Sequence, residues 1–146
     1  MANTDTTLHG LSSSKALIVE DDIVLFLVIE DELKCLGVSQ VFHATRVADA
    51  LAILERDKPD MAILDVTLDG DHVFPVAEKL DEAKVPFFFI TAYPPETIPE
   101  EWAERVVLQK PVHPPRLRAS VMAALKIGSD DKERPAATAS AVPKQA

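Results

Sequence analysis

The sequence has 146 residues, of which 24 are acidic and 15 basic, for a formal net charge of −9. This length suits one domain, because a compact core commonly takes about 100–150 residues. The acidity argues against nucleic acids and anionic membranes as partners, since both attract cationic surfaces.

Both ends of the chain have compositions that are typical of disordered segments. Residues 1–14 are rich in Thr and Ser, and residues 128–146 contain small, polar and proline residues with little apolar material. Such segments cannot bury enough apolar surface to offset the entropy lost on folding. We therefore expect disordered tails at 1–14 and 128–146, one folded domain at 15–127 and no effector domain after it.

Between the tails, short apolar runs alternate with longer amphipathic segments. The runs that predict strands are residues 16–19, 38–43, 61–64, 87–90 and 106–108. The segments that predict helices are residues 22–36, 47–56, 74–83, 99–104 and 114–127. Strands that are apolar throughout suit a sheet covered on both faces. The alternation therefore predicts an α/β fold, (βα)5, with a doubly wound five-stranded parallel sheet.

The fourth predicted helix is the weakest of the five. Pro94, Pro95 and Pro99 crowd its start. Proline removes a backbone donor and clashes with the preceding turn of a helix. We expect this helix to be short or irregular.

Four of the five predicted strands are followed by polar or charged residues. These residues are, in chain order, Glu20, Asp21, Asp22, Asp65, Thr91 and Lys110. Ligands of open parallel sheets bind beyond the carboxyl ends of the strands, so these side chains are expected to share one crevice. Each residue alone has an ordinary explanation as a turn or a strand end, and we expect Asp22 to cap the first helix.

Taken together, these residues favour a site for a cation and an anion. Carboxylates that lie close together repel one another unless a cation intervenes, and oxygen ligands suit Mg²⁺. A lysine at the rim then favours a bound anion, most simply a phosphoryl group. The four dispersed glycines exclude phosphate-binding glycine loops, and the single cysteine, Cys35, excludes a cysteine zinc site and fits a reducing cytosol.

Four segments resemble the receiver domain of two-component response regulators, of the chemotaxis type. They are ALIVEDD (16–22), MAILDV (61–66), FFFITAY (87–93) and VVLQKPV (106–112). The resemblance covers residues 15 to about 127 and implies a flavodoxin-like sheet with strand order 2-1-3-4-5. The stretch LDVTLDGDHVFPVAEKL (64–80) is also similar to single-domain receivers of alphaproteobacteria.

The resemblance assigns roles to the acidic residues. Asp65 would be the phosphoacceptor, and with Asp21 it would bind Mg²⁺ directly. The backbone carbonyl of Thr67 would be a third protein ligand of the ion, and Glu20 would act through a water molecule. This pattern is compatible with Mg²⁺, which usually keeps several waters.

The resemblance also implies how the site signals. Lys110 would hold phosphoryl oxygens, and Thr91 would be the switch hydroxyl that moves to the phosphoryl group. The peptide between Lys110 and Pro111 matches a pair that is commonly cis in the family. The aromatic switch residue expected three positions before the lysine is absent, because Val107 stands there, and the aromatic residue close to the switch hydroxyl is Tyr93, two residues after Thr91.

The resemblance implies a cytoplasmic bacterial signalling protein that is not a classical enzyme. It would take a phosphoryl group from a histidine kinase or a phosphotransfer protein, with Mg²⁺-dependent self-phosphorylation and autodephosphorylation. A downstream target protein or a homodimer would carry the signal. A phosphorylation-independent interaction module and a phosphate sink are the alternatives, whereas an aspartate-nucleophile phosphatase would want an acid where Thr67 stands.

The first predicted helix has too many apolar residues for one buried face. If Phe26, Ile29, Leu33 and Leu36 point inward, then Val24 and Leu27, with the neighbouring Val28, face outward or lie at an edge. Deeper burial beneath neighbouring elements is one interpretation. The other is a docking patch for a histidine kinase, a phosphotransfer protein or a second receiver.

Overall fold

The computed structural model describes residues 14–129. The predicted tails, 1–14 and 128–146, therefore lie almost entirely outside the described residues. Among residues 14–129, no helix is both long enough and apolar enough to cross a membrane.

The centre of the fold is a five-stranded parallel sheet. Its strands are β1 (Lys15–Val19), β2 (Gln40–Ala44), β3 (Met61–Asp65), β6 (Phe87–Thr91) and β7 (Val107–Gln109). They lie in the order β2-β1-β3-β6-β7, and every neighbouring pair is parallel. This order confirms the predicted sheet, with β6 and β7 as its fourth and fifth strands.

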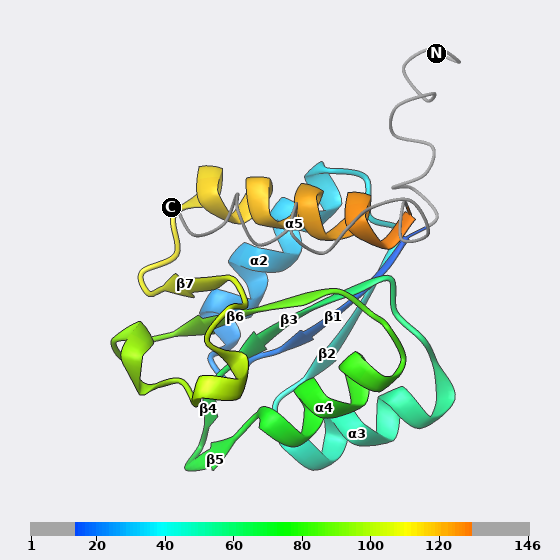
Figure 1. Cartoon of the computed structure of the whole chain (residues 1–146). Coiled ribbons are helices and arrows are strands. Elements are labelled where there is room, and N and C mark those ends of the chain that lie inside the picture. The colour runs from blue at the N-terminus through cyan, green and yellow to red at the C-terminus, as the bar shows by residue number, and fades with distance from the viewer. Residues whose placement is uncertain (1–13, 130–146) are drawn as a thin grey trace, which may run out of the picture.

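Four α-helices cover the two faces of this sheet. They are α2 (Ile23–Cys35), α3 (Val47–Arg56), α4 (Phe74–Glu82) and α5 (Pro114–Ser129). Helices α2 and α5 lie together over one face, and α3 and α4 lie together over the other (Figure 1). The predicted doubly wound α/β architecture is thus confirmed.

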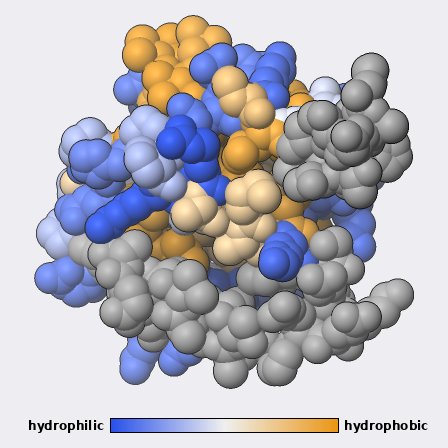
Figure 2. Space-filling model, turned by 90° about the horizontal axis from the view of Figure 1, so that it is seen from above, coloured by the Kyte–Doolittle hydropathy of each residue, from blue (hydrophilic) through white to orange (hydrophobic). Residues whose placement is uncertain are grey.

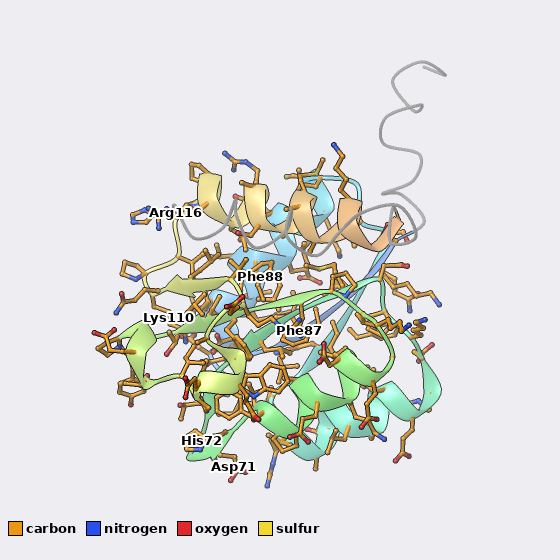
Figure 3. All side chains as sticks on the ribbon, viewed as in Figure 1. Asp71, His72, Phe87, Phe88, Lys110 and Arg116 are labelled. Atoms are coloured by element: carbon orange, nitrogen blue, oxygen red, sulfur yellow. The ribbon has the colours of Figure 1, made fainter. Side chains whose placement is uncertain are left out.

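The two helical layers explain why the strands are apolar throughout. Every residue of β3 and β6 is buried. Successive side chains of a strand point to opposite faces, so Phe87 packs on the α3–α4 side and Phe88 on the α2–α5 side (Figure 3). A strand that contacts helices on both faces needs no polar alternation.

The end of α2 corrects one predicted boundary. Val38 was expected to begin the second strand, but β2 begins at Gln40. The backbone N–H of Val38 instead donates to Leu33 O at 3.0 Å, and that of Gly37 donates to Lys34 O at 3.0 Å. This pattern is a Schellman cap, in which Gly37 adopts a positive φ of 102° at no steric cost.

The segment predicted as a fourth helix contains no α-helix. Residues Pro95–Thr97 and Glu100–Trp102 form two short 3₁₀ turns, η1 and η2. The prolines before each turn explain the irregular backbone, as expected. Trp102 is buried and packs edge-on against Phe87 and Phe89, which anchors this segment to the sheet.

A short hairpin that is not among the predicted elements lies between β3 and α4. It pairs β4 (Thr67–Leu68) antiparallel with β5 (Asp71–His72). The two turn residues, Asp69 and Gly70, have φ of 48° and 92°. Two positive φ values are what a two-residue type I′ turn needs, and Asp-Gly is a strong signal for it.

Candidate functional site

The structure brings the polar residues that follow the strands to one edge of the sheet. Glu20 follows β1, Asp65 ends β3 and Thr91 ends β6, and all three are buried. Lys110 follows β7 and lies on the loop that leads to α5 (Figure 3). Residues that are up to 90 positions apart in the chain, from 20 to 110, thus meet because parallel strands share a carboxyl edge.

Three carboxylates form a compact group at this edge. Glu20, Asp21 and Asp65 each place one oxygen within 4.8 Å of the others. Asp21 is exposed, whereas Glu20 and Asp65 are buried. Asp22 is not in this group, because its Oδ1 accepts from the backbone N–H of Val24 at 2.9 Å and caps α2. The expectation that Asp22 is a helix cap is confirmed.

Lys110 contacts two of these carboxylates at once. Its Nζ lies 3.2 Å from Oδ2 of Asp65 and 3.2 Å from Oε1 of Glu20. Because of these two contacts, the ammonium group bridges the end of β1 and the end of β3. The peptide that follows, Lys110–Pro111, is cis, as the resemblance implied.

Burial changes the acid–base properties of the group. It raises the pKa of Glu20 to about 7, and the nearby charge of Asp65 adds to this rise. Burial also raises the pKa of Asp65, against the opposing effect of Lys110. Partial burial lowers the pKa of Lys110, but the two carboxylates outweigh it and the pKa lies above its ordinary value. A cation among these carboxylates would favour their charged forms.

The hydroxyl of Thr91 is engaged with the loop that follows β6. Its Oγ1 accepts a hydrogen bond from the backbone N–H of Tyr93 at 3.0 Å. The carbonyl of Thr91 accepts from the N–H of Lys110 at 2.7 Å, which joins this loop to the lysine. The side chain of Tyr93 is 55% exposed, and Val107 is half-buried.

Thr67 lies at the start of β4, two residues after Asp65. Its backbone N–H points to Oδ1 of Asp65 at 3.4 Å. The hairpin is closed onto the end of β3 by a hydrogen bond from Val73 N to Val66 O at 2.9 Å. The segment after Asp65 is therefore an ordered hairpin, and the Asp69-Gly70 pair was the signal that could have predicted it.

The outer face of the first two turns of α2 is apolar and exposed. Ile23, Val24, Leu27 and Val28 are 55%, 67%, 53% and 43% exposed, and we call these four residues the α2 patch. Figure 2 shows hydrophobic residues gathered at the upper edge of the view, on the side where α2 lies behind α5 in Figure 1. The sequence allowed either burial or exposure of Val24, Leu27 and Val28, and the structure shows that they are exposed.

Comparison with known proteins agrees with this geometry. Residues 16–122 match the family model described as the response regulator receiver domain, and the chain therefore belongs to that family. Receiver domains are signalling domains that accept a phosphoryl group, and they are not classical enzymes. They typically bind Mg²⁺ at a group of carboxylates.

Several individual proteins are similar to this chain. It is 35% identical to SdrG from Sphingomonas melonis Fr1, whose solution structure matches with a TM-score of 0.67 over 81% of this chain and 98% of that chain. The crystal structure of the response regulator PhyR from Brucella abortus matches with a TM-score of 0.71 and 27% identity, over 90% of this chain and 56% of that chain.

One curated relative is the sensory transduction protein LytT of Bacillus anthracis. It is 37% identical over 86 residues, which are 54% of this chain and 33% of LytT. The chain therefore spans about a third of the length of the curated relatives it matches.

Proposed function

We propose that this chain is a single-domain response regulator that accepts a phosphoryl group on Asp65 and signals through protein contacts. The supporting observation is the position of Lys110 Nζ, 3.2 Å from both Asp65 and Glu20, beside three carboxylates at the carboxyl edge of the sheet. A nucleophilic carboxylate, a cation site and an ammonium group are the parts that phosphoryl transfer to an aspartate requires.

In the proposed reaction, Asp65 supplies the nucleophile. A carboxylate oxygen of Asp65 forms a bond to phosphorus, and the P–N bond of a donor phosphohistidine breaks. The imidazole leaves with the bonding electrons and remains on the donor protein. Lys110 contacts phosphoryl oxygens and stabilises the negative charge on the transferring group. Later attack by water on phosphorus releases phosphate and restores Asp65.

The residues at this edge fit a magnesium ion. Asp21 and Asp65 would hold it through their carboxylates, Thr67 through its backbone carbonyl, and Glu20 through a water molecule. The observation that favours a cation is the group of three carboxylates, Glu20, Asp21 and Asp65, whose oxygens lie within 4.8 Å of one another, so that their negative charges exceed the single positive charge of Lys110. When bound, Mg²⁺ would supply positive charge that attracts the phosphoryl oxygens and offsets the repulsion between the carboxylates.

Thr91 is the proposed switch. In the present conformation its Oγ1 accepts from Tyr93 N, so the hydroxyl is tied to the loop after β6. A phosphoryl group on Asp65 offers new acceptor oxygens, and the hydroxyl would donate to one of them. The carbonyl of Thr91 also accepts a hydrogen bond from the N–H of Lys110. Movement of Thr91 would therefore displace the loop after β6, which this bond joins to Lys110. Phosphorylation of Asp65 would thus be a local change of charge that shifts the loop after β6 from one conformation to another.

The proposed donor is a histidine kinase or a phosphotransfer protein that docks on the α2 patch. This patch begins at Ile23, two residues after Asp21, so a partner that covers it also reaches the phosphoacceptor edge. Exposed apolar groups beside a reaction site favour a partner that buries them transiently. The proposal places the chain in the bacterial cytoplasm with that donor, and its output is a downstream target protein.

The direct test is phosphorylation by a small donor. Wild-type protein and Asp65→Asn are incubated with acetyl phosphate and MgCl₂, and their intact masses are measured. The proposal predicts one phosphate adduct on the wild type and none on Asp65→Asn. A folded wild type that gains no adduct would instead favour the second candidate, a phosphorylation-independent interaction module on the same scaffold.

A further inference from the structure

His43 and Phe26 form a stacked pair next to the acidic end of β1. His43 lies on β2, where the parallel register places it opposite Ile18, two residues before Glu20. Its half-buried ring stacks on the ring of Phe26 with 3.6 Å between ring centroids and 8° between the planes. The pair therefore joins β2 to the first turns of α2, around the turn that carries Glu20 and Asp21.

The imidazole of His43 also makes a polar contact with this turn. Its Nε2 lies 2.9 Å from the backbone carbonyl oxygen of Glu20. A carbonyl oxygen can only accept, so Nε2 must carry the hydrogen and donate it. The stack on Phe26 holds the plane of the ring in the orientation that this bond needs.

Two hydrogen bonds hold Glu20 in addition to this contact and the ion pair with Lys110. Its N–H donates to Ala44 O at 3.0 Å, and its side-chain Oε2 accepts from Asp22 N at 2.9 Å. The carbonyl held by His43 belongs to the peptide that links Glu20 to Asp21. Because a peptide group is planar, the bond from His43 also orients the N–H and Cα of Asp21.

We propose that His43 is a positioning residue for the Mg²⁺ site, acting through the Glu20–Asp21 peptide, and this inference rests on the proposed function. Asp21 is exposed, and neither a hydrogen bond nor an ion pair of its side chain is found in the described structure, so its backbone is what places its carboxylate near Asp65. Groups that orient metal ligands influence metal affinity without touching the ion. Phe26 supports His43 in this role.

The test distinguishes the effect of the hydrogen-bond donor of His43 from the effect of its aromatic ring. His43→Phe keeps a ring for the stack but removes the donor, and His43→Gln keeps an N–H donor at a similar reach. The Mg²⁺ dissociation constant of each variant is measured by isothermal titration calorimetry with MgCl₂, and stability is measured by thermal unfolding without Mg²⁺. His72→Phe is the matched control, because it makes the same substitution at an exposed imidazole in the hairpin.

We expect His43→Phe to bind Mg²⁺ about tenfold more weakly than the wild type. We expect His72→Phe to bind close to wild type, and His43→Gln, which keeps a donor but not the stack, to bind Mg²⁺ more tightly than His43→Phe. The melting curves should show that both His43 variants are folded at the temperature of the titration. The inference is overturned if His43→Phe binds Mg²⁺ with wild-type affinity. It is also overturned if His43→Gln binds Mg²⁺ as weakly as His43→Phe. If the wild type binds no Mg²⁺ at all, the proposed function fails first, which keeps the two failures distinct.

A measurement on the wild type keeps the inference testable if His43→Phe does not fold. The ¹⁵N shifts of the His43 ring report which nitrogen is protonated in the neutral imidazole. The inference predicts a proton on Nε2. A neutral ring that is protonated on Nδ1 alone has no donor for the Glu20 carbonyl and overturns it.

Discussion

The ammonium group of Lys110 lies 3.2 Å from Oε1 of Glu20, whose side chain is fully buried. This oxygen has no hydrogen-bond partner among the described residues, so the ion pair is its main polar contact. A buried carboxylate that depends on one cation is costly to leave alone. Removal of the positive charge of Lys110, or addition of a cation at the carboxyl edge of the sheet, should therefore change the free energy of unfolding.

Replacement of Lys110 by Met should destabilise the protein when Mg²⁺ is absent. The change keeps the apolar stem but removes the ammonium group from Glu20 and Asp65. We expect the free energy of unfolding to fall by about 1–3 kcal/mol, the cost of an unsatisfied buried group. Urea unfolding followed by the fluorescence of Trp102 measures it. Unchanged stability would contradict the importance of this ion pair, and part of the loss should return with MgCl₂.

Addition of MgCl₂ to the wild type should raise its melting temperature. A ligand that binds only the folded state stabilises it, by about 2.7 kcal/mol at 100 times its dissociation constant. Asp21→Asn removes one of the three clustered carboxylates and should lose most of this gain. Asp31→Asn, which removes the same charge from an exposed position of α2, should keep it. Equal gains in both variants would argue against a metal site that uses Asp21.

The sheet and most of the site could be predicted because their signals are local. Each strand is an apolar run, and the polar residues that follow the strands meet wherever the strands are parallel. Asp65 and Lys110 are 45 positions apart in the chain, but each can be found from its own strand end. The predicted sheet order also needed the resemblance, since strand pairing between distant segments has no local signal.

Other features depend on contacts that a linear sequence does not show. The link between His43 and Glu20 depends on the register of β2 against β1, so His43 was interpreted only as the end of a strand. The 3₁₀ turns between β6 and β7 follow from several prolines and from the burial of Trp102. The hairpin after Asp65 is not among the predicted elements, although the Asp69-Gly70 pair is a local signal for it.

Leu27→Asp should slow phosphoryl transfer from a protein donor but not from a small one. Leu27 lies in the α2 patch and is 53% exposed, so the substitution should leave the fold intact while adding a charge to the proposed docking surface. The measurement compares phosphorylation by an autophosphorylated histidine kinase that is active on the wild type with phosphorylation by acetyl phosphate. Ala52→Asp is the control, because it adds the same charge to an exposed position of α3.

Equal loss with both donors would contradict the docking role, since it would indicate a damaged phosphoacceptor site. Unchanged transfer from the kinase would show that the α2 patch is not its docking surface. A shift of the wild type toward dimers that Leu27→Asp abolishes would identify a second copy of the chain as the occupant of the patch.

Thr91→Val should separate phosphorylation from its structural consequence. Valine has a similar shape but lacks the hydroxyl that accepts from Tyr93 N and that is proposed to move to the phosphoryl group. We expect Asp65 to be phosphorylated still, and the backbone amide signals of Ala92 and Tyr93 to shift less on addition of acetyl phosphate. Thr91→Ser keeps the hydroxyl and should respond as the wild type does. A full response in Thr91→Val would exclude this hydroxyl as the switch.

The most direct test of the central claim is to locate the phosphoryl group on the chain. Protein phosphorylated with acetyl phosphate and MgCl₂ is reduced with sodium borohydride, which converts an aspartyl phosphate to homoserine, and its peptides are sequenced by mass spectrometry. The account predicts homoserine at position 65 alone, with the clustered acids Glu20 and Asp21 unchanged. Conversion at another acid, or at none in a chain that binds Mg²⁺, would contradict it.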